Sequence, residues 1–163
     1  MYDDDFMEGE EEFEDTMQDK YLSFMLMDNC YLLAIENVIE IVSVQQITHV
    51  PEMEHFVKGV IDLRGMVIPL IDARLLFQLP EVEYNDRTSI IITSYNDKKI
   101  GIIVDYVKEV QDIHKENFSA PLSIGTSIDR KYIKGIGKTE DGVKLLLNLE
   151  SFLDTPEYEA IEV

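Results

Sequence analysis

Short apolar runs alternate with polar turns along most of this chain. From residue 20 onward, the runs rich in β-branched and other apolar residues lie at 21–27, 31–35, 38–44, 66–71, 88–94, 99–104 and 144–149. Runs of this length between polar residues are typical of β-strands. Hairpin-forming residues separate several of them, at Asp28-Asn29, Asn96-Asp97-Lys98-Lys99 and Glu140-Asp141-Gly142. The pattern predicts a body built mainly from β-strands.

Helical patterns are short by comparison. The segments 51–56, 72–77 and 148–153 are helix candidates, and each is too short for several amphipathic turns. Pro69 lies inside the run 66–71. Because proline cannot donate a hydrogen bond to a neighbouring strand, its presence predicts an edge or bulge position there.

Two pairs of segments resemble each other within the chain. IENVIEI at 35–41 resembles VDYVKEV at 104–110, with an offset of 69 positions. The stretch 58–77 resembles 134–153, with an offset of 76 positions. The simplest explanation is two related β-units, which pair to share a core with a groove at their seam. Chance similarity between short β-rich segments is the alternative.

Length and composition fit a globular protein of one domain or two small halves. The chain has 163 residues, of which 45% are hydrophobic, and a formal net charge of -19. That charge disfavours nucleic acid and anionic membrane surfaces as partners. A single cysteine, Cys30, allows no intramolecular disulfide, and no apolar run approaches the ~20 residues that span a bilayer. With an acidic N-terminus in place of a signal peptide, we expect a cytoplasmic protein without direct membrane insertion.

The charge is concentrated at the N-terminus. Residues 1–19 hold ten of the 33 acidic residues and no lysine or arginine. Such a like-charged segment repels itself and buries little, so we expect a disordered tail that aids solubility, with a short docking motif as the alternative. Residues 154–163 form a shorter acidic C-terminal extension.

The usual signatures of catalysis and of cofactor binding are missing. His49, His55 and His114 are isolated from one another, and neither HxxxH nor CxxC spacing occurs. The stretch 59–65 lacks the GKS or GKT ending of a phosphate loop, and no GxSxG is present. We therefore predict no catalytic residues, no metal and no cofactor.

One stretch carries a specific family resemblance. VKGVIDLRGMVIPLIDAR at 57–74 closely resembles the VKGVxNLRGxxxPVxDLR core of the CheW family, adaptors that couple chemoreceptors to a chemotaxis histidine kinase. Further segments resemble the family in the same order, at 21–42, 84–93, 101–110, 132–137 and 145–153. The resemblance implies a mainly β fold, with two SH3-like five-stranded β-barrel subdomains packed around a shared hydrophobic seam and a few short helices. It assigns residues 20–153 to one CheW-like domain, to whose two barrels separate parts of the chain can contribute.

The resemblance also implies a partner-binding surface. Its expected positions are Val38, Glu40, Gly59, Arg64, Gly65, Val107 and Val110. The implied partners are the helical-hairpin tip of a chemoreceptor, bound in a groove between the subdomains, and the regulatory domain of the kinase, bound at a barrel end. Local alternatives remain: Arg64 as an ordinary exposed turn residue, the valines as plain core, and the glycines as backbone positions.

The resemblance predicts a non-enzymatic adaptor recruited to membrane receptor arrays. An adaptor of a chemosensory pathway controlling pili or another output is one alternative, and a β-barrel ligand-binding protein or enzyme is another. The chain departs from the family pattern in three places: Asp62 replaces a common asparagine, 32–34 replaces a glycine-containing segment, and the acidic tail is an addition.

Overall fold

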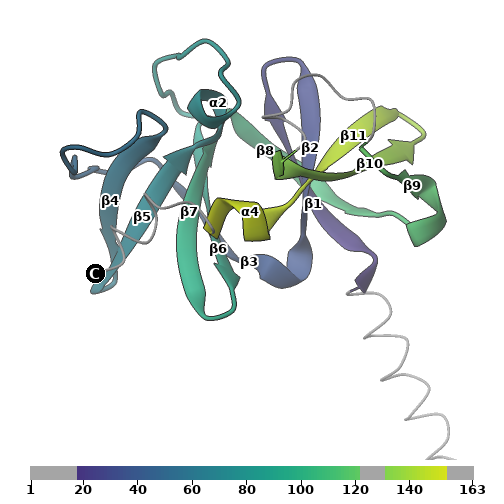
Figure 1. Cartoon of the computed structure of the whole chain (residues 1–163), viewed down its shortest axis with the longest axis horizontal. Helices are drawn as coiled ribbons and strands as arrows, with labels where there is room; N and C mark the ends of the chain where they lie inside the picture. Colours follow the sequence, from purple (N-terminus) through teal and green to yellow (C-terminus); the bar gives the residue numbers. More distant parts are fainter. Residues whose placement is uncertain (1–17, 122–130, 154–163) are drawn as a thin grey trace, which may run out of the picture.

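Two β-subdomains lie side by side in the structure. The computed structural model describes residues 18–121 and 131–153 (Figure 1). The central subdomain contains β3 (Val38–Ser43), β4 (Val57–Leu63), β5 (Met66–Asp72), α2 (Ala73–Leu76), β6 (Ser89–Tyr95) and β7 (Lys98–Val104). The terminal subdomain contains β1 (Lys20–Leu26), β2 (Asn29–Ala34), β8 (Tyr106–Asp112), β9 (Phe118–Ser119), β10 (Ile133–Thr139), β11 (Gly142–Leu147) and α4 (Leu149–Leu153). Two single-turn 3-10 helices, η1 (Ile35–Asn37) and η2 (Lys115–Asn117), complete these elements.

The chain crosses between the subdomains twice. It leaves the terminal subdomain after β2, builds the central subdomain from β3 to β7, and returns with β8. The central sheet has the order β3-β6-β7-β5-β4, and the terminal sheet has the order β8-β1-β2-β11-β10-β9. In the central subdomain, Thr48 and Val60 exchange backbone hydrogen bonds of 2.8 and 2.9 Å, which join β4 to the segment after β3 and close the barrel.

The internal resemblance is confirmed by the topology. The first strand order becomes the second when each strand is replaced by its equivalent: β3 by β8, β6 by β1, β7 by β2, β5 by β11 and β4 by β10. Each sheet contains a parallel pair at the corresponding place, β5 with β7 and β11 with β2. The register shifts between Val57 and Gly59 in one unit and between Ile133 and Gly135 in the other, as the offset of 76 requires. The two halves are therefore related β-units, and the resemblance is not chance.

The larger hydrophobic cluster lies at the seam. Both subdomains contribute to it, with Phe24, Tyr31 and Leu33 from one and Ile91, Ile100 and Ile102 from the other. The two short helices add Leu76 and Phe152. A smaller cluster fills the central barrel, formed by Ile61, Ile68, Leu70, Ile90, Ile92 and Ile103. Since each half alone would expose its share of the seam, burial of this surface holds the two units together.

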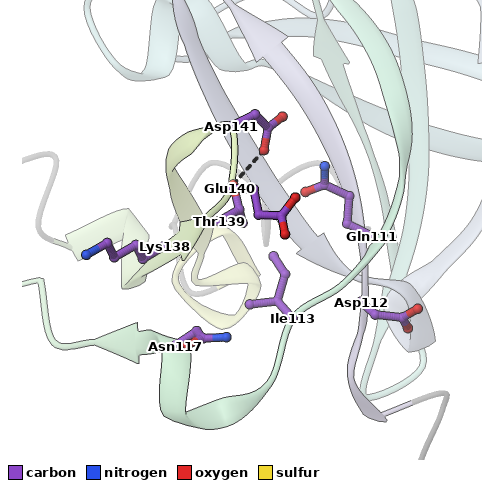
Figure 2. A pocket seen from close by; sticks show the side chains of 8 residues that line it. All are labelled: Gln111, Asp112, Ile113, Asn117, Lys138, Thr139, Glu140 and Asp141. Carbon is purple, nitrogen blue, oxygen red and sulfur yellow. Dashed lines mark hydrogen bonds between the residues drawn. The ribbon is translucent and has the colours of Figure 1, made fainter.

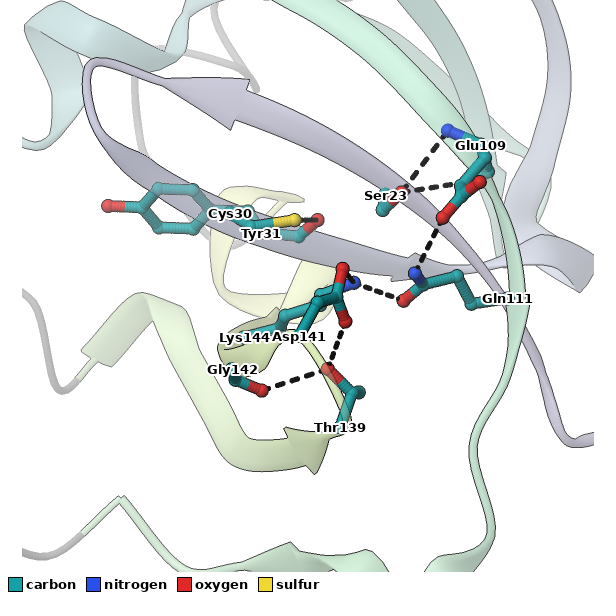
Figure 3. Close-up of polar contacts among 9 residues, drawn as sticks. All are labelled: Ser23, Cys30, Tyr31, Glu109, Gln111, Thr139, Asp141, Gly142 and Lys144. Carbon is teal, nitrogen blue, oxygen red and sulfur yellow. Dashed lines mark hydrogen bonds and ion pairs between the residues drawn. The ribbon is translucent and has the colours of Figure 1, made fainter.

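The interior of the terminal barrel is more polar than that of the central one. Lys144, which is 2% exposed, occupies the position that corresponds to Ile68 under the internal offset. Ser23, which is fully buried, likewise corresponds to Ile92. The Lys144 ammonium donates to Oε1 of Gln111 at 2.5 Å, as Figure 3 shows.

Most predicted elements are confirmed, including the helices at 72–77 and 148–153. Asp72 accepts a hydrogen bond from Leu75 N at 3.3 Å and caps α2. The helix expected at 51–56 is wrong, because these residues form turns and irregular backbone, with Glu52 at a φ of 63°. Six residues gain too few helical hydrogen bonds to offset nucleation without an apolar face to pack. The first hairpin turn lies at Met27-Asp28, one residue earlier than predicted.

The edge position predicted for Pro69 is confirmed locally, although β5 as a whole is not an edge strand. Strand β5 is internal to its sheet, between β7 and β4. Its pairing with β7 begins only at Leu70, so at Pro69 the strand has no partner on that side and proline costs no ladder bond there. The bulge in the β4–β5 pair lies between Val57 and Gly59, away from the proline.

The acidic tail up to residue 17 and the extension at 154–163 lie outside the described residues. None of the helices in the described part is long and apolar enough to cross a membrane.

Candidate functional site

The turn between β4 and β5 is built to display Arg64. Leu63 pairs with Met66, so Arg64 and Gly65 form a two-residue hairpin turn, with φ values of 51° and 85°. Positive φ at both positions is the type I′ geometry that matches the twist of paired strands. The Asp62 carboxylate accepts a hydrogen bond of 2.9 Å from Gly65 N, as a side-chain amide oxygen would. The family departure at Asp62 therefore preserves the turn.

Arg64 forms an ion pair with Glu40. Its Nη2 contacts Oε1 of Glu40, which lies on β3, the strand at the other end of the sheet order from β4. The side chain of Arg64 is 70% exposed, whereas that of Glu40 is 28% exposed. A guanidinium has five N–H donors, so most remain available to an acceptor on a partner. The two residues are thus brought together as the resemblance implied.

Strand β3 presents its residues through a bulge. Val38 pairs with Thr93 and Glu40 with Ile92, so Ile39 is the extra residue. Val38 is half-buried and packs against the seam cluster, while Ile39 is 47% exposed. The strand therefore carries core packing and an exposed surface within three residues.

Strand β8 repeats this arrangement in the other subdomain. Val107 pairs with Phe24, Glu109 pairs with Ser23, and Lys108 is the extra residue. Val107 corresponds to Val38 and also packs against the seam cluster. Val110, in contrast, is 49% exposed. Of the three valines, two are partly core and one is a surface residue.

The two predicted glycines have different environments. Gly59 is buried with a φ of 137°, and an added Cβ would lie 2.0 Å from the carbonyl oxygen of Thr48. Gly59 lies where β4 meets the segment after β3 and the barrel closes, which favours a role in allowing close backbone approach over a role in partner contact. Gly65 is exposed, and nothing lies within 4 Å of an added Cβ there. Half-buried Glu40 and exposed Arg64 and Gly65 therefore form one surface group, which we call the arginine turn.

Sequence reasoning missed an ion pair at the seam. Arg74 of α2 contacts Asp105, which follows β7, with both side chains mostly buried. The sequence did contain a signal for this pair. The internal offsets align Asp105 with another acid, Glu36, but align Arg74 with an acid, Glu150, so the arginine is a change of charge between the two halves.

The role of Asp72 was also missed. Its Oδ2 accepts a 2.6 Å hydrogen bond from the Tyr84 hydroxyl, and burial together with this bond raises the pKa of Tyr84 well above its ordinary value.

A polar hollow opens at one end of the terminal barrel. It has a volume of about 800 Å³ and is lined by residues of β8, η2 and the β10–β11 turn. Figure 2 shows Gln111 and Glu140 directed into it and the Lys138 ammonium directed away. Gln111 and Asp141 are already engaged by Lys144, at 2.5 and 3.3 Å. Within 18–121 and 131–153, no group of three His, Cys, Asp or Glu side chains is arranged to hold a metal ion.

Known proteins match most of the chain. A family model for the CheW-like domain matches residues 20–157. The chain is 36% identical to the chemotaxis protein CheW of Bacillus subtilis over 137 residues, covering 83% of this chain and 87% of that protein. It is 33% identical to the chemotaxis protein CheW of Helicobacter pylori over 144 residues, covering 88% of this chain and 86% of that protein.

A solved structure matches as well. The scaffolding protein TtCheW from Thermoanaerobacter tengcongensis superposes with a TM-score of 0.79 at 33% identity, covering 86% of this chain and 96% of that one. This match confirms the predicted architecture of two SH3-like barrels.

Proposed function

This chain belongs to the CheW family, and from that premise we propose that it is a non-enzymatic adaptor that couples chemoreceptors to a chemotaxis histidine kinase. Its relatives are named as chemotaxis proteins and as a scaffolding protein, which supports chemotaxis as the output and assembly as the role. We place the protein in the cytoplasm, recruited to receptor arrays at the membrane.

The arginine turn is the observation that carries the receptor-binding part of this proposal. A fixed hairpin holds an exposed guanidinium beside one carboxylate, with further donors directed to solvent. Such a group can bind a carboxylate or carbonyl on a partner in a defined direction. Exposed Ile39 and Ile41 on the same edge strand offer apolar contact area beside it.

The expected partner surface is helical. A receptor tip is a helical hairpin, and an amphipathic helix can lay its apolar side into a groove while polar groups fix its register. We place this contact at the seam, where β3 and β8 each carry a valine packed against the shared core. Individually weak contacts of this kind are strengthened when many copies assemble in an array.

The experiment is reconstitution with purified components. Receptor-dependent kinase activity is measured with a receptor cytoplasmic fragment, the histidine kinase and this chain, and then without this chain. We expect receptor control of the kinase only when the chain is present, with both partners retained on it in a pull-down from its own cell extract. Control of the kinase by the receptor that is independent of this chain would remove the proposed function.

A further inference from the structure

The crossing between the subdomains at Asp105 is held by directional contacts. Asp105 lies between β7 of the central subdomain and β8 of the terminal one. Arg74 of α2 binds its carboxylate through two guanidinium nitrogens, with Nε to Oδ1 at 2.6 Å and Nη2 to Oδ2 at 2.7 Å. This bidentate arrangement constrains orientation as well as distance.

The same carboxylate holds the terminal subdomain. Its Oδ2 accepts a 2.8 Å hydrogen bond from Met27 N, in the β1–β2 turn. The backbone N–H of Asp105 donates to the Met25 carbonyl at 3.1 Å. Arg74 is fixed in turn, because its Nη1 donates to the Pro80 carbonyl at 2.9 Å. One carboxylate therefore joins a helix of one subdomain to a turn of the other.

The Arg74–Asp105 pair is mostly buried. The side chains of Arg74 and Asp105 are only 13% and 18% exposed. Burial opposes ionisation of Asp105, but the hydrogen bonds from Arg74 and Met27 outweigh it and lower the pKa of Asp105 below its ordinary value. The carboxylate is thus held in its charged form.

The corresponding end of the seam is built differently. Under the internal offsets, Glu36 is equivalent to Asp105 and Glu150 is equivalent to Arg74. This end of the seam therefore has two acids where the other end has an acid and a base. Both line a cavity of about 240 Å³ together with Tyr95 and Lys134. No ion pair of Glu36 or Glu150 occurs among the described residues. The seam is fastened by a charged pair at one end and hollow at the other.

We propose that the Arg74–Asp105 pair is a positioning contact that fixes the angle between the two subdomains and so the relative placement of β3 and β8 for partner binding. Burial of apolar surface at the seam is a non-directional force, whereas a bidentate ion pair requires one relative orientation of its two groups. Asp105 immediately precedes β8, which carries Val107 and Val110. The part of this inference that concerns binding rests on the proposed adaptor function, and the part that concerns the angle does not.

The test measures the distance between the subdomains directly. Spin labels are attached at Val67→Cys and Val143→Cys, two positions 68% and 62% exposed on different subdomains, in a Cys30→Ser background. Pulsed electron resonance then gives the distance distribution in the parent, Asp105→Asn, Arg74→Gln and the double variant. Asparagine keeps an acceptor for Met27 N but loses the charged fork. A label pair at Val67 and Asp97, both in the central subdomain, is the internal control.

We expect the distribution of distances between the labels on the two subdomains to widen in each variant, while the distribution for the control pair stays narrow. The double variant should be no wider than the broader single variant, because both substitutions remove the same contact. Receptor-fragment affinity should fall by about fivefold or more, the usual lower range for coupling between sites. Lys58→Gln, which removes the exposed Lys58–Glu81 pair, should change neither readout.

A distribution between subdomains that matches the parent in folded variants would overturn the inference, whatever happens to binding. If a variant fails to fold, Arg74→Lys serves instead, since it keeps the charge and loses the fork; the same widening supports the inference and a parental distribution overturns it. A parent that binds no receptor fragment would count against the proposed function alone, because the distance measurement still decides the angle.

Discussion

At the scale of single residues, conformation and charge decide what each side chain of the arginine turn can do. Arg64 has a positive φ, which an L-residue adopts at a cost, and its carboxylate partner lies on a different strand. An exposed pair of this kind contributes only ~0 to 1 kcal/mol to folding. Its contribution to stability is therefore small, and under the proposed function its role is recognition.

For the arginine turn, we predict that Arg64→Ala melts close to the parent but binds the receptor fragment about tenfold or more weakly, a loss of over ~1.4 kcal/mol. The substitution removes the directed donors and leaves Glu40 as an unpaired charge facing the partner. Glu40→Ala should act in the same direction, and the double variant should lose less than the two single losses added together. Kinase binding should suffer less.

Lys58→Ala is the matched control, because Lys58 of β4 forms a different surface ion pair, with Glu81, which this substitution removes. Calorimetry of binding and thermal melting are measured on these four variants and the parent. Strictly additive losses, or parental receptor binding by Arg64→Ala, would return Arg64 to an ordinary turn residue.

Gly59 and Gly135 provide a comparison that sequence alone does not distinguish. They are equivalent under the internal offset, but an added Cβ would lie 2.0 Å from Thr48 O at Gly59 and 3.3 Å from Ser119 O at Gly135. Gly59→Ala should therefore lower the free energy of unfolding by more than the ~1 to 3 kcal/mol of backbone strain alone. Gly135→Ala should cost clearly less. Urea unfolding of the two variants decides this, and equal midpoints would contradict it.

The same comparison refines the role of Gly59 in binding. Gly59→Asp should weaken partner binding more than Lys58→Asp does, because the glycine holds the barrel closed while the Lys58 side chain reaches a surface carboxylate. The loss of binding by Gly59→Asp should be proportional to the fraction of this variant that is unfolded. A fully folded Gly59→Asp variant with impaired binding would instead assign the glycine to the contact surface.

At the scale of strands, the two barrels fill equivalent space with different residues. Gly101 of β7 lies against Leu70 and Ile90 of the central barrel, and the equivalent position in β2 is Leu32. Leu32 in turn reaches Gly137, whose equivalent in the central barrel is Ile61. A large residue in one unit thus matches a small one in the other, as close packing of an interior requires.

Lys144 allows a test of the polar barrel interior. Lys144→Met removes the cost of burying an ammonium, and its ion-pair partner Asp141 is 54% exposed and stays hydrated, so the free energy of unfolding should change by less than about 1 kcal/mol or rise. Gln111→Leu leaves the ammonium without its 2.5 Å acceptor and should cost about 1 to 3 kcal/mol. Ile68→Met is the matched control at the equivalent position. Chemical denaturation measures all three, and a greater loss for Lys144→Met than for Gln111→Leu would contradict the prediction.

At the scale of the whole molecule, we expect the acidic N-terminal segment to contribute little to the stability of the folded body. Deleting residues 1–17, which carry like charges and few apolar groups, should leave the melting temperature within about 2 °C of the parent. A deletion of 1–20 is the control. It removes the Asp19 carbonyl, which accepts from Ile113 N at 2.9 Å, and the Lys20–Asp112 ion pair, so it should melt lower. Equal melting of the two deletions, measured by circular dichroism, would place the boundary elsewhere.

The sequence by itself determined the strand content, the two related halves and the turn that contains Arg64. Strand runs, hairpin residues and the offsets of 69 and 76 are local or periodic signals, and each persists whatever the rest of the chain does. The motif at 57–74 was sufficient to predict the family. The helix expected at 51–56 failed because a local pattern cannot report whether an apolar face finds a surface to cover.

Only the tertiary structure decided where charges and glycines are placed. The burial of Lys144, the contact of Gly59 with Thr48 and the junction of Arg74 with Asp105 each join segments distant in the sequence. Local periodicity carries no information on such pairs, because the free energy of a buried charge or a close backbone approach depends on atoms brought there by folding. The repeat could show that Glu36 and Glu150 replace an acid and a base, but only the fold shows that the charged pair joins two subdomains.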